Sequence, residues 1–111
     1  MQIDLSSEQM KQKVADLKRE HGALRLLQHM GHGVILRRAS EAEWEAFSAM
    51  FAEAQKRHGG QRWLLETTAV FPAAEEVKAM FRTVPGLVQN FGAEAMAFNG
   101  LDNKDVEKKD L

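Results

Sequence analysis

The stretch ILRRASEAEWEAF, residues 35–47, contains the point at which an apolar segment gives way to an amphipathic one. Its two adjacent arginines, Arg37 and Arg38, have three interpretations. They contact phosphate, or they anchor a docked protein, since arginine is enriched at interface hot spots. The third interpretation is that they alternate along a strand, with aliphatic stems at the edge of the core and a head paired with Glu41 or Glu43. This last interpretation is favoured.

A helix is expected directly after the arginines. Ser40 and Glu43 have the spacing of a capping box, in which the two side chains bond the free backbone N–H groups of the first helical turn. The apolar residues that follow recur at three- and four-residue intervals and share one face, namely Trp44, Phe47, Met50, Phe51 and Ala54. We expect this helix to reach about His58 and to end at Gly59-Gly60.

The segment before the arginines, residues 23–38, predicts a β-hairpin. Its two apolar runs, ALRLLQHM and VILRR, are separated by Gly31-His32-Gly33. A three-residue connection that contains glycine is typical of a hairpin with a bulge or a wider turn. The open alternative is that residues 23–30 continue the preceding helix, because Leu, Arg, Gln and Met are good helix formers.

The preceding helix is short. Ser6, followed by Gln9 three residues later, is expected to be its N-cap. A narrow apolar stripe then runs along one face, formed by Met10, Val14 and Leu17. The pair His21-Gly22 predicts the end of the helix, since glycine readily adopts the left-handed conformation of a C-terminal cap.

Three further elements are expected downstream. Residues 62–71, RWLLETTAVF, are apolar nearly all round and predict a buried helix, with a strand as the open alternative. Pro72 and Pro85 each suit the first residue of a helix, where a missing N–H is no loss. The inward stripes of these two helices are Val77, Met80, Phe81 and Val84, and then Leu87, Val88, Phe91, Ala95, Met96 and Phe98. The last helix is expected to end near Asn99-Gly100.

Together these elements predict a mainly α domain of the α+β class, with about five helices and one β-hairpin near residues 23–38. The 111-residue chain has the length of one domain, which we assign to residues 1–100. Residues 101–111, LDNKDVEKKDL, have almost nothing to bury, so we expect them to form a charged and disordered tail.

The charge balance argues against a nucleic-acid binder. The chain has 15 basic and 16 acidic residues, whereas nucleic-acid modules carry a clear basic excess. It contains no cysteine, which suits a reducing compartment. The first ten residues, MQIDLSSEQM, lack the features of a signal peptide, and no apolar run approaches the roughly 18 residues of a membrane span. We expect a cytoplasmic protein without a membrane partner.

No pattern predicts catalysis or metal binding. His29 and His32 have no carboxylate or cysteine nearby in the sequence, and we expect them to flank a turn, while His21 and His58 are expected to end helices. The serines at helix starts are explained as caps, and Gly31-His32-Gly33 lacks the lysine of a phosphate loop. We therefore expect no enzymatic activity, no cofactor and no metal.

The apolar residues are numerous for a small domain, with two Trp, six Phe and six Met. Helical spacing makes core packing the default for each of them. Methionine, however, adapts to irregular partners on binding surfaces. An exposed groove or an oligomer contact formed by some of Met80, Phe91, Met96 and Phe98 is therefore the open alternative.

The order of these features resembles that of tail assembly chaperones of tailed phages. The resemblance comprises an apolar strand that ends in Arg37-Arg38, then Glu43-Trp44 and Phe47, LLETTAVFP, the turn PGLV at residues 85–88 and a final helix that closes on Gly100. It covers residues 22–100. Ala39 departs from the family pattern, which often has proline at this position.

The resemblance implies a small, helical, non-enzymatic protein that binds the tape measure protein and helps to recruit tail tube subunits. It implies action in the host cytoplasm and absence from the finished virion, and it leaves self-association open. The candidate partner-binding residues are Arg37, Arg38, Trp44, Met80, Phe91, Met96 and Phe98. The alternative function is a small nucleic-acid-binding regulator that uses Arg37 and Arg38.

Overall fold

The computed structural model describes residues 2–102 and 109–110, and the predicted tail therefore lies largely outside the described residues. The elements follow in the order α1 (Glu8–His21), β1 (Leu24–His29), β2 (His32–Arg37), α2 (Glu41–Ala52), the 3-10 helix η1 (Ala54–Lys56), α3 (Arg57–Thr68), β3 (Ala69–Phe71), α4 (Ala74–Thr83) and α5 (Leu87–Phe98). The predicted class is confirmed: five helices accompany a hairpin, to which a third strand is added.

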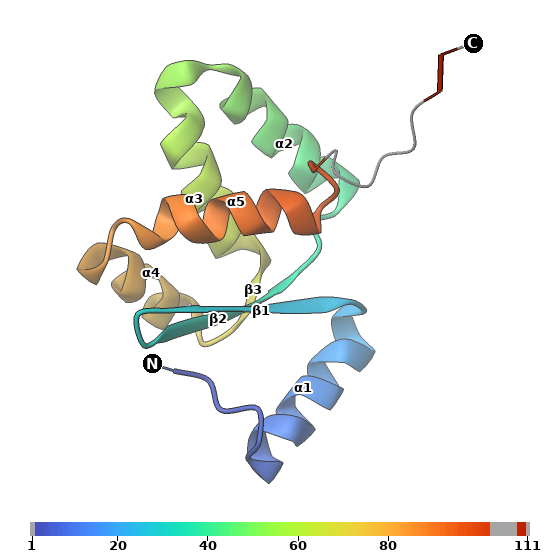
Figure 1. The fold of residues 1–111 in the computed structure, drawn as a ribbon, viewed down its shortest axis with the longest axis vertical. Coiled ribbons are helices and arrows are strands. Elements are labelled where there is room, and N and C mark those ends of the chain that lie inside the picture. Colours follow the sequence, from blue (N-terminus) through green and yellow to red (C-terminus); the bar gives the residue numbers. More distant parts are fainter. Residues whose placement is uncertain (1, 103–108, 111) are drawn as a thin grey trace.

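The sheet lies between two helical layers (Figure 1). Its order is β1-β2-β3 with antiparallel pairing, and α1 lies on one face while α3, α4 and α5 lie on the other. Val34, Ile35 and Leu36 are all buried, because β2 is the central strand and is covered on both faces. Val34 and Leu36 join the main core with α3 to α5, whereas Ile35 faces α1. The uninterrupted apolar run in the sequence thus reflects a strand with no exposed face.

The hairpin turn is one position earlier and shorter than predicted. His29 and His32 are register partners, so the turn consists of Met30 and Gly31, with φ angles of 52° and 75°. Two positive φ angles are typical of the two-residue turns that match the twist of paired strands. Gly33 lies within β2, where an added Cβ would be 3.1 Å from the side chain of Ile3. Its role is close packing, which the sequence alone did not indicate.

The first helix starts one residue later than expected. Ser7 is the N-cap, since its Oγ accepts a hydrogen bond from the Met10 N–H at 3.1 Å. Ser6 instead donates its hydroxyl proton to Asp4 at 2.6 Å. The predicted end is confirmed at Gly22, which has a φ of 79°.

The prediction that Gly59-Gly60 ends a helix was wrong. Helix α2 ends at Ala52, and both glycines lie inside the first turns of α3. Gly60 is buried where α3 crosses α2, and a Cβ there would lie 3.0 Å from the Cβ of Met50. Glycine stands at this position because the two helices approach closely. His58 consequently lies near the start of α3 instead of ending a helix.

Both alternatives for residues 62–71 contain part of the answer. Helix α3 continues to Thr68, and the chain then pairs with β2 as β3, with Leu36 opposite Ala69 and Ile35 opposite Phe71. The two prolines do not begin helices as expected, because α4 starts at Ala74 and α5 at Leu87. The predicted inward stripes do form the core, except that Val84 and Met96 are half-buried.

The two adjacent glycines of α3 should respond oppositely to alanine. Gly59→Ala adds a Cβ that has no neighbour within 4 Å, so removal of backbone freedom should stabilise the protein by roughly 0.5–1 kcal/mol. Gly60→Ala should destabilise it, because the Cβ of Met50 cannot move without shifting α2. Urea denaturation of both variants tests this. Equal effects of the two substitutions would contradict the close approach of α2 and α3.

Met30→Asn should stabilise the protein by about 1 kcal/mol, because asparagine tolerates the left-handed conformation better than methionine does. The Met30 side chain is 68% exposed, so its replacement removes little packing. Met30→Ala is the matched control, because it also removes the methionine side chain. Alanine keeps a Cβ, which is unfavourable at this positive φ angle, and lacks the polar group of asparagine. A thermal melting shift as large for alanine as for asparagine would show that the backbone angle is not the cause.

Candidate functional site

Arg37 joins the end of β2 to the start of α2 and to the end of α3. Its Nη1 and Nη2 donate to Glu43 Oε1 and Oε2 at 2.7 and 2.9 Å, which forms a two-pronged ion pair. Its Nη2 also donates to the Thr67 carbonyl oxygen at 3.1 Å, in the last turn of α3. Carbonyls at the end of a helix lack partners within the helix, and a cation there is favourable. The predicted pairing with a nearby acid is thus confirmed for Glu43.

The same contact sets the electrostatics of the junction. The Arg37 guanidinium, helped by the backbone N–H of Ser40, lowers the pKa of Glu43 to about 2, although partial burial opposes this shift. The Glu43 carboxylate in turn raises the pKa of Arg37. The predicted capping box is present, since Ser40 Oγ accepts from the Glu43 N–H and Glu43 accepts from the Ser40 N–H.

Arg38 points to a different helix. Its Nε donates to the carbonyl oxygen of Phe98, the last residue of α5, at 3.1 Å, and its guanidinium stacks 4.9 Å from the centre of the Phe98 ring. Beside it, the Ala39 N–H donates to Asn99 Oδ1 at 2.7 Å. Arg37 therefore contacts α2 and α3, whereas Arg38 contacts α5. Such a difference is expected of adjacent residues whose side chains alternate between the faces of a strand. The junction is tied to α2, α3 and α5 at once.

The apolar candidate residues do not together form one exposed groove, although Phe91 lines the groove described below and Met80 lines a separate hollow beside His32. Met80, Phe91 and Phe98 are only 5%, 3% and 6% exposed, so their side chains belong to the core. Trp44 and Met96 are half-buried and pack against that core. The reason is that α4 and α5 lay their apolar stripes on the sheet and on α3, which leaves no free apolar face on either helix.

A groove lies instead between β1 and α5, and sequence reasoning missed it. It encloses about 670 Å³ and is lined by Leu26, Leu27, His29, Asn90, Phe91 and Glu94, among others. Apolar and polar atoms contribute about equally to its lining, and the polar ones include amide, imidazole and carboxylate groups. In the sequence, the polar residues of 87–98 indicate the outer side of a helix. They do not indicate that β1 lies opposite that side.

Strand β1 forms one edge of the sheet. Within residues 2–102 and 109–110 it pairs with β2 alone, so the N–H and C=O groups on its other side have no strand partner. Such an edge is a template for an added strand. The groove therefore offers two means of holding a polypeptide segment, namely apolar contact and backbone hydrogen bonds.

Comparisons with protein-family models, curated proteins and solved structures found no match. In the part of the chain that the structure describes, no three His, Cys, Asp or Glu residues are grouped to hold a metal ion. Nor is any helix in that part both long and apolar enough to span a bilayer. His29 and His32 face each other across the turn, as expected. The groove and the nearby arginines are the surface features considered below.

Glu43→Gln should destabilise the protein in a pH-dependent manner. Because folding lowers the pKa of Glu43, its stabilisation is complete above pH 4.5 and is lost as the pH falls toward 2. We expect the free energy of unfolding of the wild type to exceed that of the variant by on the order of 2 kcal/mol at pH 7. This difference should disappear near pH 2. Chemical denaturation across this range measures it.

The control is Glu45→Gln, which changes an exposed carboxylate on the same helix that forms no ion pair with another described residue. It should leave stability within about 0.5 kcal/mol of the wild type at every pH. A difference for Glu43→Gln that does not vary with pH would contradict the ion pair with Arg37.

Proposed function

We propose that this protein is a non-enzymatic tail assembly chaperone of a tailed phage or prophage, and that it binds the tape measure protein. We further propose that it helps to recruit tail tube subunits in the host cytoplasm and that it is absent from the finished virion. The resemblance in the order of motifs over residues 22–100 is the first support. The second is that these motifs have a common structural purpose in this chain.

The motif residues act at the junction and at the ends of α5. Arg37 with Glu43 connects β2 to α2, and Arg38 holds the end of α5. The turn at residues 85–88 starts α5, and Gly100, with a φ of 96°, follows its end. Proteins with the same motif order would therefore share the geometry that places α5 beside β1.

The observation that carries the proposal is the groove between β1 and α5, beside an open sheet edge. A long helical protein presents amphipathic segments that aggregate when unassembled, and a groove lined by both apolar and polar side chains suits one such segment. The volume of about 670 Å³ is open along its length and suits a few side chains of a polypeptide. A binding role of this kind needs no catalytic group.

The alternative of a nucleic-acid regulator has less support. Arg37 is already bonded to Glu43 and to Thr67, so one of the two arginines proposed for phosphate is committed. Residues 39–102 contain nine acidic and five basic residues, which would repel a phosphate backbone along that part of the surface. A protein partner is the better fit to this distribution of charge.

The test is co-expression with the tape measure protein encoded in the same tail gene cluster. We expect the chaperone to raise the soluble fraction of that protein and to co-purify with it. Ala93→Trp, on the exposed side of α5 within the groove, should weaken the complex at least about tenfold by filling the groove. Ala46→Trp, equally exposed on α2, is the control and should not weaken it. Absence of any complex with the wild type would refute the proposal.

A further inference from the structure

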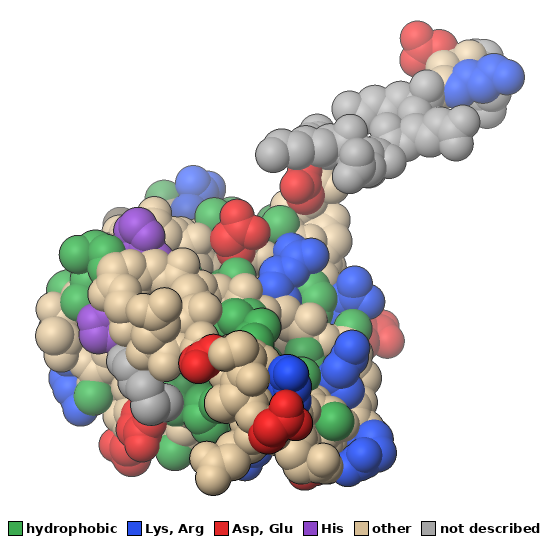
Figure 2. Space-filling view, turned by 60° about the horizontal axis from the view of Figure 1, so that its bottom comes forward, with side chains coloured by type: hydrophobic (Ala, Val, Ile, Leu, Met, Phe, Trp, Pro, Cys, Tyr) green, Lys and Arg blue, Asp and Glu red, His purple; other side chains and the backbone are tan. Residues whose placement is uncertain are grey.

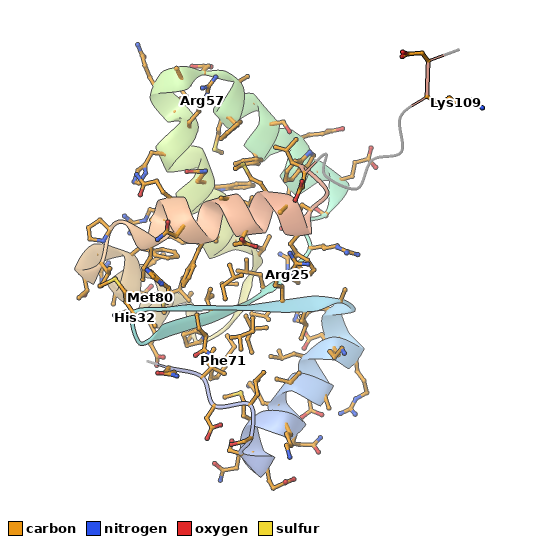
Figure 3. The ribbon with its side chains drawn as sticks, in the orientation of Figure 1. Arg25, His32, Arg57, Phe71, Met80 and Lys109 are labelled. Carbon is orange, nitrogen blue, oxygen red and sulfur yellow. The ribbon has the colours of Figure 1, made fainter. Side chains whose placement is uncertain are left out.

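Two arginines meet on one aromatic ring at the end of the groove. The guanidinium carbons of Arg25 and Arg38 lie 4.7 and 4.9 Å from the centre of the Phe98 ring. They come from β1 and from the residue after β2, and both side chains are exposed. Figure 3 shows Arg25 beside the end of α5, next to the sheet. The two charges are therefore separated by no more than the sum of those distances.

Neither arginine is paired with an acid of the residues that the structure describes. Most other basic side chains near a carboxylate form ion pairs, as Arg37 does with Glu43 and Arg62 does with Glu66. Within residues 2–102 and 109–110, no carboxylate lies within ion-pair distance of Arg25 or Arg38. Arg38 uses only its Nε, for the Phe98 carbonyl, which leaves its terminal N–H groups available. Arg25 makes no hydrogen bond in that part of the chain beyond the strand pairing of its backbone.

The two like charges are held together by their stacking on Phe98. Each cation is attracted to the ring, but the cations repel one another, and an anion bound near both of them would relieve that repulsion. The planar guanidinium has N–H groups arranged in a fork that matches the two oxygens of a carboxylate. The aromatic ring also restricts the motion of both side chains, so less freedom is lost when an anion binds.

The segment that carries the two arginines has a small basic excess. Residues 1–38, which form α1 and the hairpin, contain seven basic and four acidic residues, and Arg25 and Arg38 are two of these seven. Figure 2, in which the α1 side faces forward, shows Lys and Arg side chains interspersed with Asp and Glu side chains. The local attraction for an acidic partner therefore comes mainly from the two arginines themselves.

We propose that Arg25 and Arg38 together bind a carboxylate of an acidic side chain on the protein segment that occupies the groove between β1 and α5. Arg25 directly precedes Leu26, which lines the groove, and Phe98 ends the helix that forms its other wall, so the arginines adjoin the groove without lining it. The inference rests on the proposed function for the identity of the partner. It predicts that the bound segment carries Asp or Glu next to its apolar residues.

A protein carboxylate fits this site better than nucleic acid does. Two arginines contact too few phosphates to hold a duplex at physiological salt, because that affinity grows with the number of phosphates neutralised. Glu94 lines the adjoining groove and would repel a phosphate backbone that ran along it. An isolated carboxylate followed by apolar side chains meets no such repulsion.

The first experiment titrates the full chain with sodium succinate and follows the arginine Nε–H resonances by NMR. The Arg25 and Arg38 resonances should shift together in a saturable manner. Arg57 is the matched control, because it too stacks on a phenylalanine and donates its Nε to a carbonyl, in this case of Phe51. Figure 3 shows it at the opposite end of α3 from the sheet. Equal shifts at Arg57, or a stronger effect of duplex DNA than of succinate at Arg25 and Arg38, would overturn the inference.

The second experiment uses the complex with the tape measure protein. Arg25→Gln and the double variant with Arg38→Gln should weaken binding by about tenfold or more, while Arg57→Gln should not. Arg25→Gln removes no protein hydrogen bond from the fold, so the test survives if the Arg38 variant unfolds. Unchanged affinity in these variants overturns the carboxylate site and leaves the proposed function intact. If the wild type forms no complex, the proposed function fails, and the succinate titration alone decides on the carboxylate site.

Discussion

The structure depends on the attachment of two adjacent arginines to the ends of different helices. Arg37 holds the first turn of α2 through Glu43 and the last turn of α3 through the Thr67 carbonyl, while Arg38 holds the last carbonyl of α5. Helix ends expose carbonyl groups that need donors, and a guanidinium supplies several in one plane. A pair of residues at the end of β2 thereby fixes three helices relative to the sheet.

This attachment also determines the surface available to a partner. Because Arg38 and the Ala39 N–H hold the end of α5, that helix runs beside the open edge of β1, and the groove lies between them. The apolar stripe of α5 is consumed by the core, so binding relies on its polar outer side and on β1. The junction is thus structural in itself and functional through the groove that it positions.

Local features could be predicted from the sequence, and contacts between distant segments could not. The capping box at Ser40, the hairpin and the apolar stripes follow from spacing alone. Gly60 was misassigned because no local pattern shows that the helix carrying Met50 packs closely against it. The burial of Met80 and Phe91 likewise depends on what covers them, and the groove requires residues 24–29 to lie beside residues 87–98. No spacing rule contains that adjacency.

The most direct test of this account is a double-mutant cycle that combines Arg37→Gln with Asn99→Ala. The free energy of unfolding of each variant is measured by chemical denaturation at pH 7. Asn99 accepts the Ala39 N–H and donates to the Ala95 carbonyl, so it fastens the junction to α5 without touching Arg37. If the junction acts as one unit, the two losses of stability should be coupled by at least about 0.5 kcal/mol. Additive losses would show that the Arg37 contacts and the attachment of α5 through Asn99 act independently, and would contradict the account.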